Sequence, residues 1–192
     1  MNRYSRGALA CAVVFATACA RTAPEPQLQS PSTIKDIMDS MVEPSADFIF
    51  DSVAQIADEH GITEKAPHTD EEWKEVRRRA VQLIEAPNLL VMPGRKSADP
   101  KDRSQNPKIE LQPEEIQKLI DADHPAFSAR ALVLQDAATL ALKAIDAKNA
   151  KGLFDAAGEL DKACENCHLH YWYPNDERAQ AAFKESQRLL GK

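Results

Sequence analysis

The residues Cys164-Glu165-Asn166-Cys167-His168 form the pattern C-x-x-C-H near the C-terminal end of the chain. On a helix, positions i, i+3 and i+4 lie on one face, so two thiols and one imidazole meet there. Such thiols can add to two vinyl groups on one edge of a porphyrin, while the imidazole binds its iron. This is the attachment motif of covalent c-type haem. The sequence therefore predicts one haem c, bound through Cys164 and Cys167, with His168 as the proximal iron ligand.

Two other chemistries use a C-x-x-C pair. A thioredoxin-type redox pair belongs to a βαβ context, whereas the sequence on both sides of this motif has a helical pattern. A structural zinc site needs a second pair of ligands, and the sequence offers none at a suitable spacing. Haem attachment is the preferred interpretation.

The first residues have the pattern of a secretory signal peptide. Arg3 and Arg6 give a basic start, and Ala8–Ala18 is an apolar stretch too short to span a membrane. Small residues before Cys19 provide a cleavage site. We therefore expect residues 1–18 to be removed on export and the mature protein to be periplasmic, on the side of the membrane where covalent haem is attached.

Cys19 has two interpretations. Ala16-Thr17-Ala18-Cys19 resembles a bacterial lipobox, although Ala16 stands where leucine is usual. In the first interpretation, Cys19 is lipidated and anchors the protein to a membrane. In the second, cleavage is ordinary and Cys19 has no role. Residues 19–32 contain three prolines and few large apolar groups, so we expect an extended tether.

The charge balance limits the partners. The formal net charge of −6 becomes −8 when Arg3 and Arg6 leave with the signal peptide, because two positive and no negative side chains are lost. Haem propionates would add more negative charge. Nucleic-acid binding is not expected on this balance. A redox protein with a basic docking face is the expected partner, and a homodimer is an alternative assembly.

The rest of the chain predicts helices, because glycines are few and no alternating strand pattern stands out. Amphipathic helices are expected over residues 33–59, with a kink at Pro44, from Thr69 to Pro87, over 125–147 and over 150–172. A long connection covers 88–112, a short helix covers 113–122, and a polar helix covers 176–190. The expected N-caps are Thr69, in a capping box with Glu72, Asn149 for the helix over 150–172 and Asn175 for the polar helix. The predicted apolar stripes are Ile34, Met38, Met41, Ser45 and Phe48; Trp73, Val76, Ala80 and Leu83; Phe127, Ala131, Leu134, Ala138, Ala141 and Ile145; and Leu153, Ala157, Leu160, Cys164, Cys167 and Tyr171.

These patterns predict an all-α protein: an antiparallel four-helix bundle over residues 33–175, with haem near the C-terminal end of the fourth helix, and a helical extension over 176–192. In such a bundle the start of the first helix and the end of the fourth share one end. At 1.5 Å per residue, Met38 lies about 7 Å and Met41 about 12 Å into the first helix, a depth similar to that of the C-x-x-C-H motif. Met38 is the preferred sixth ligand and Met41 the alternative, while simple core packing with an open iron site is also compatible.

The other histidines are weaker candidates as ligands. His60 and His68 fall at the opposite end of such a bundle. His124 lies at the correct end but more readily caps a helix or faces solvent, and His170 should point away from the motif. An arginine near the haem would neutralise the propionates. Arg95 is the best candidate because its loop emerges beside the haem, whereas Arg77–Arg79 better fit a solvated face.

Several segments, taken together, resemble a known family. They are Pro44–Asp47 with Ser52-Val53, Thr69–Trp73, Asn88–Arg95 and Cys164–Tyr171. The chain resembles the class II cytochromes c, the cytochrome c′ group, and within it a subgroup of exported proteins of undefined role. The resemblance covers about residues 33–173. It implies thioethers at Cys164 and Cys167 and a proximal His168, with a methionine of the first helix, best matched by Met38, in low-spin members. High-spin members leave that position to small gases.

Three functions follow from these observations. The first is a one-electron carrier with six-coordinate haem. The second is a five-coordinate haem protein that binds or senses NO or CO. The third is an accessory subunit of a larger redox complex, docked through the long connection and the C-terminal extension, which the commonest short members of the family lack. No nucleophile–base pair accompanies the motif, so an enzyme is not expected.

Overall fold

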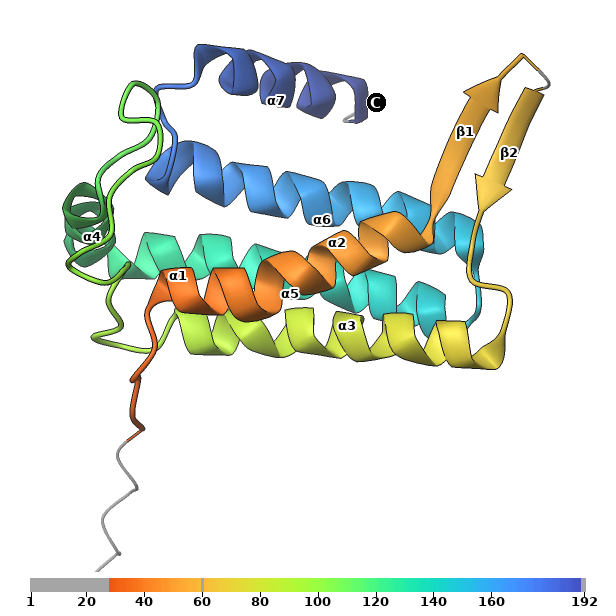
Figure 1. Ribbon diagram of the computed structural model, residues 1–192, viewed down its shortest axis with the longest axis horizontal. Helices are drawn as coiled ribbons and strands as arrows, with labels where there is room; N and C mark the ends of the chain where they lie inside the picture. The colour runs from red at the N-terminus through yellow and green to blue at the C-terminus, as the bar shows by residue number, and fades with distance from the viewer. Residues whose placement is uncertain (1–27, 60, 191–192) are drawn as a thin grey trace, which may run out of the picture.

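The computed structural model describes residues 28–59 and 61–190, and over these residues the chain is mostly helical, as predicted (Figure 1). The predicted signal peptide, the start of the tether with Cys19, and His60 lie outside the described residues. No helix in the described part is long and apolar enough to cross a membrane.

The first helical segment is divided into three parts: α1 (Ile34–Ile37), the π-helical η1 (Met38–Val42) and α2 (Glu43–Ser52). Pro44 lacks an N–H and crowds the carbonyl four residues before it. In the turn before Pro44 the hydrogen bonds widen, so that the N–H of Glu43 donates to the carbonyl of Met38. A wider π turn is the usual way for a helix to absorb such a defect.

The π turn rotates the buried face of this segment relative to the predicted stripe. The predicted Phe48 is 36% exposed, whereas Ile49 is completely buried. Ser45, which was predicted, is buried as expected. The predicted stripe is therefore only partly correct. The buried residues of the segment are Ile37, Val42, Ser45, Ala46 and Ile49.

The prediction of a helix to residue 59 was wrong. The chain leaves the helix at Val53, which is extended, and enters a hairpin of β1 (Ala54–Asp58) and β2 (Gly61–Lys65). The strands pair antiparallel, with Ile56 opposite Thr63. Gly61 has φ +127°, a conformation that favours glycine. The hairpin projects from the helices in Figure 1, so neither face of it shows the buried stripe from which strands are usually recognised.

The second long helix, α3 (Asp70–Leu90), begins as predicted with Thr69 as N-cap in a capping box with Glu72. Its predicted stripe of Trp73, Val76, Ala80 and Leu83 is buried. Pro87 does not end it: the helix continues to Leu90, and the N–H of Val91 donates to the carbonyl of Pro87 at 3.1 Å.

The remaining helices are α4 (Pro113–Ala122), α5 (His124–Asp146), α6 (Ala150–Tyr171) and α7 (Glu177–Leu190), close to the predicted ranges. Asn149 caps α6 as predicted. Asp176, rather than the predicted Asn175, bonds the N–H of Ala179 near the start of α7. Apart from Cys164 and Cys167, which are half-buried, the predicted stripes of α5 and α6 are buried.

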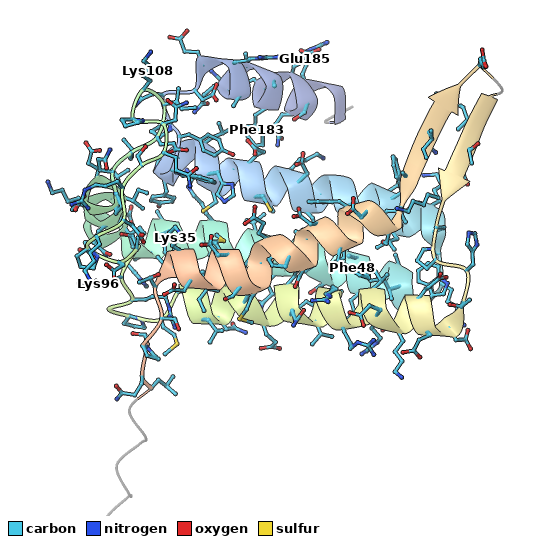
Figure 2. All side chains as sticks on the ribbon, in the orientation of Figure 1. Lys35, Phe48, Lys96, Lys108, Phe183 and Glu185 are labelled. Atoms are coloured by element: carbon cyan, nitrogen blue, oxygen red, sulfur yellow. The ribbon has the colours of Figure 1, made fainter. Side chains whose placement is uncertain are left out.

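The segment α1–η1–α2 and the helices α3, α5 and α6 lie side by side and alternate in direction (Figure 1). The most extensive contacts join α3 with α5 and α5 with α6. Small residues allow these helices to approach closely: Ala80, Ala86, Ala137, Ala138, Ala141, Ala156 and Ala157 are buried. The start of α1 and the ends of α3 and α6 therefore gather near the start of α5. The helix α7 covers α6, toward which Phe183 extends (Figure 2).

Replacing Leu83 by alanine should lower the free energy of unfolding by about 2–5 kcal/mol, because a completely buried side chain in the core is lost. Leu140→Ala is the matched control, since Leu140 is 48% exposed and should cost about 1 kcal/mol or less. Denaturant unfolding measures both. Equal effects of the two substitutions would contradict the core described here.

Candidate haem site

A small apolar cavity of about 30 Å³ lies among α1–η1–α2, α3, α5 and α6. It brings together the predicted cysteines, the predicted proximal histidine and the preferred methionine from segments far apart in the sequence. Apolar side chains from all the surrounding helical segments complete its walls. The lining residues are Met38, Val42, Leu90, Phe127, Ala131, Leu134, Ala163, Cys164, Cys167 and His168.

Cys164 and Cys167 are both free thiols. Burial, assisted by the nearby Asp161, raises the pKa of Cys164 to about 12. Burial raises the pKa of Cys167 to about 11. Reactive redox cysteines have a lowered pKa, so these thiols do not have the electrostatics of a thioredoxin-type pair. They lie instead one turn apart on the cavity side of α6.

His168 follows Cys167 on the same helix, and its ring is enclosed by aromatic side chains. The ring of Trp172 packs edge-on against it with centroids 5.1 Å apart, and the ring of Tyr173 lies tilted at 5.8 Å. Burial lowers the pKa of His168, which favours the neutral imidazole that binds metals. Its Nδ1 lies 3.5 Å from the hydroxyl of Tyr173, which leaves Nε2 available for an iron.

The structure separates the two methionine candidates. Met38 lines the cavity with His168, whereas Met41, although packed against the core, does not. Met38 is the first residue of the π-helical η1. Sequence periodicity could not reveal this π turn, yet such turns are frequent at functional sites.

The long connection positions the start of the first helical segment. The N–H groups of Ile34 and Lys35 donate to the carbonyls of Lys96 and Ser97 at 2.8 and 2.9 Å. Thr33 adds a capping box with Asp36. Because α1 has only four residues, these bonds anchor the chain within one turn of Met38, which follows directly.

Arg95 is buried, with 5% of its surface exposed. Its Nε donates to the carbonyl of Leu89 at 2.6 Å, its Nη1 to the carbonyl of Ser32 at 2.5 Å, and its Nη2 lies 3.2 Å from the sulfur of Met92. Arg95 therefore joins the end of α3 to the residues before α1, and it does not line the cavity. Its predicted contact with a propionate stays a prediction, and these contacts favour a structural role.

Arg130 of α5 is a cation beside the motif that the sequence analysis did not select. Its Nη1 donates to the side-chain oxygen of Asn166 at 2.8 Å and lies 3.4 Å from the carbonyl of the same residue. Its charge also acts on Cys167. One feature of the sequence could have indicated Arg130: it lies three residues after Phe127, beside the predicted apolar stripe of α5.

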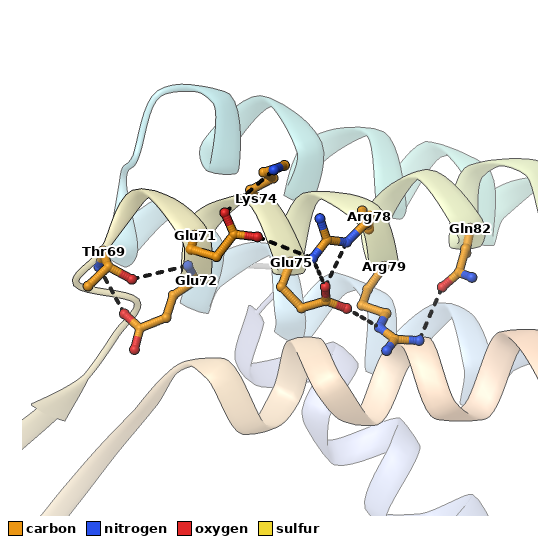
Figure 3. A network of polar contacts seen from close by, with 8 residues as sticks. All are labelled: Thr69, Glu71, Glu72, Lys74, Glu75, Arg78, Arg79 and Gln82. Carbon is orange, nitrogen blue, oxygen red and sulfur yellow. Dashed lines mark hydrogen bonds and ion pairs between the residues drawn. The ribbon is translucent and has the colours of Figure 1, made fainter.

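In the arginine run of α3, Arg77 and Arg78 are exposed, as predicted, whereas Arg79 is half-buried. Arg78 bonds Glu75 and also lies 3.7 Å from Glu71, while Arg79 bonds Glu75 at 3.1 Å (Figure 3). Arg77 pairs with Asp146 of α5 at 2.7 Å. These exposed pairs add little stability, and none of the three arginines lines the cavity.

The other described histidines lie away from the cavity lining. His124 is half-buried at the start of α5, with its Nδ1 3.4 Å from the hydroxyl of Ser128. His170 is exposed, which confirms that it points away. His68 precedes α3 and is exposed.

A larger groove of about 460 Å³ lies where the hairpin meets α2 and α3. It is lined by Phe48, Val76 and charged side chains and contains no residue of the predicted site. We therefore place the candidate site in the smaller cavity, which holds the donor atoms. Among residues 28–59 and 61–190, no group of three or more His, Cys, Asp and Glu side chains is arranged to hold a metal ion by itself.

Comparison with known proteins adds no relative. No protein-family profile matches the chain. No curated protein and no solved structure matches it either.

Arg95→Gln should lower the free energy of unfolding by about 2–3 kcal/mol, because buried carbonyl acceptors lose a charged donor. Arg103→Gln is the control, since the Arg103 side chain is 64% exposed. With the predicted haem bound, the reduction potential of both variants should equal that of the wild type. A shifted potential with unchanged stability would instead support the predicted contact between Arg95 and a propionate.

Proposed function

We propose that this protein is an exported one-electron carrier of the class II cytochrome c type, in which an antiparallel four-helix bundle holds one covalent haem c. Cys164 and Cys167 would form the thioethers, His168 would be the proximal ligand and Met38 the distal ligand. The observation that carries this proposal is the shared cavity: residues 126 positions apart, Met38 and Cys164, line one apolar space with Cys167 and His168.

The donor set fits haem c. Each thiol would add across one vinyl group, which forms one C–S bond and transfers the thiol hydrogen to the vinyl carbon, so no oxidant is consumed. The neutral imidazole of His168 and the thioether of Met38 are a common ligand pair for electron-transfer haems. Apolar walls, including Phe127 and Leu134, would exclude water and stabilise the ring by burial.

The cavity volume sets a condition on this proposal. About 30 Å³ accommodates only a water-sized group, so haem binding requires the first helical segment and α6 to lie further apart. The contact of α2 with α6 is much smaller than that of α5 with α6. The first segment packs mainly on α3, so haem binding would require it to shift relative to α6 while the packing of α3, α5 and α6 is retained.

The charges around the site support a redox role. Arg130, beside Cys167, is a second candidate to neutralise a propionate. Trp172, whose ring packs against His168, is 43% exposed, so the site lies close to the surface. When bound, haem would supply the one-electron Fe(III)/Fe(II) couple. The acidic chain, with its formal charge of −6, favours a redox partner with a basic docking face.

The covalent attachment predicts the behaviour of cysteine variants. The wild-type chain, exported by a host that matures c-type cytochromes, should retain haem on a denaturing gel stained for haem. Cys164→Ala or Cys167→Ala should leave at most one thioether, and the double variant should lose all stain. Ser186→Ala, away from the cavity, is a control that should stain fully. Haem removed from the wild type by acid–acetone would contradict covalent attachment.

The distal ligand decides between electron transfer and gas binding. Reduced wild-type protein should show a low-spin spectrum that carbon monoxide does not change. Met38→Ala should convert it to a high-spin form that binds carbon monoxide, while Met41→Ala should not, since only Met38 lines the cavity. A wild type that is already high-spin and binds carbon monoxide would reject the carrier in favour of the gas-binding alternative.

A further inference from the structure

The end of α6 carries a chain of polar groups that the proposed function does not use. The hydroxyl of Tyr173 donates to Oε1 of Glu165 at 2.7 Å. The same hydroxyl oxygen lies 3.5 Å from Nδ1 of His168, at the long limit of a hydrogen bond. Glu165 and Tyr173 are both half-buried, so this chain lies partly shielded from water.

The backbone fixes Tyr173 in this place. The carbonyl of His168 accepts two hydrogen bonds, from the N–H of Trp172 at 2.8 Å and from the N–H of Tyr173 at 3.0 Å. This pair of bonds closes the helix and turns the chain back over its last turn. Pro174 follows and disfavours a helical conformation at Tyr173. The phenol is thus held beside the histidine by the way in which α6 ends.

The directions of the hydrogen bonds follow from chemistry. A carboxylate only accepts, so the hydroxyl hydrogen of Tyr173 is directed to Glu165. The phenol oxygen can then accept only from His168, whose Nδ1 must carry the ring hydrogen. That tautomer leaves the lone pair on Nε2, the nitrogen available to the iron. A partner on the second nitrogen is the usual means of orienting a metal-binding histidine and raising its basicity.

We propose that Glu165 and Tyr173 are positioning residues that hold His168 in the Nδ1–H tautomer and tune the iron through it. This inference rests on the proposed function. Electron density shifted from the carboxylate through the phenol makes the imidazole a stronger donor and stabilises Fe(III) relative to Fe(II). This chain of hydrogen bonds from Glu165 through Tyr173 to His168, here called the relay, therefore lowers the reduction potential of the haem.

The test measures the reduction potential of the full mature protein. Tyr173→Phe keeps the ring and removes the hydroxyl, and we expect a positive shift in potential with unchanged haem attachment. Glu165→Gln should also shift the potential upward. Ser186→Ala is the control, because it also removes a hydroxyl, but one that donates to the carbonyl of Phe183 and lies outside the cavity lining. Its potential should equal that of the wild type.

Loss of a negative charge alone raises a potential, so Glu165→Gln needs a charge control. Asp161→Asn removes a carboxylate one turn away, close enough to act on Cys164, but not bonded to Tyr173. The effect of Glu165→Gln should shrink when combined with Tyr173→Phe, because both act through one hydrogen-bonded chain. The effect of Asp161→Asn should be the same with or without Tyr173→Phe.

The outcomes separate this inference from the proposed function. The relay is supported if the haem is covalent, the reduction potential rises in Tyr173→Phe, and Glu165→Gln has a smaller effect when Tyr173→Phe is also present. Covalent haem with an unchanged potential in Tyr173→Phe, or with additive shifts, overturns the relay and leaves the carrier function intact. A wild type without covalent haem overturns the proposed function, and the relay with it.

Discussion

The rotation of α6 about its own axis is the constraint on which the site depends. Cys164, Cys167 and His168 lie on one face because the helix repeats every 3.6 residues, and the buried positions Leu153, Ala157 and Leu160 turn that same face inward. A shift of one residue in this packing would turn both thiols toward solvent. The alanine-rich contact with α5 opposes such a shift, because closely approached helices interlock through their small side chains.

A second constraint acts on the opposite wall of the cavity. The first helical segment begins with only four α-helical residues before the π turn, too few to hold Met38 in place by themselves. The long connection supplies the missing support through the carbonyls of Lys96 and Ser97 and through the buried Arg95. The length of this loop is thus explained by its contacts: it returns from the end of α3 to hold the start of α1. In the proposed haem-bound form, this segment, held at its start and widened at η1, would lie further from α6.

Much of this architecture could be predicted from the sequence because it depends on local patterns. The capping box at Thr69, the N-cap Asn149 and the regular stripes of α5 and α6 indicated helices whose buried faces the structure confirms. The sequence predictions failed where a local pattern was compatible with more than one structure. Pro44 was expected to kink a helix, but a π turn absorbed it and rotated the buried face. The hairpin was missed because residues 55–57 and 61–65 are exposed and form no apolar stripe. The assignment of the Asp176 cap depends on the exact turn after Pro174, which periodicity does not determine.

The candidate site, too, could be predicted from the sequence only in part. The C-x-x-C-H spacing was sufficient to select Cys164, Cys167 and His168, and the expected helix directions brought Met38 to the same end. The partners of Arg95, Arg130 and Tyr173 could not be deduced, because each depends on loop geometry or on contacts between helices. Arg95 shows this best: its position beside the cavity end was expected, but its burial and its bonds to backbone carbonyls arise only when the loop folds back.

We propose that this cavity holds a haem joined to two cysteines of one helix. The most direct test is peptide mapping of the exported protein by mass spectrometry. Trypsin cuts after Lys162 and Arg178, so residues 163–178 form one peptide that contains both cysteines and His168. We expect this peptide to carry one haem and neither cysteine to react with an alkylating agent. The same peptide recovered without haem, and with both thiols alkylated, would contradict it.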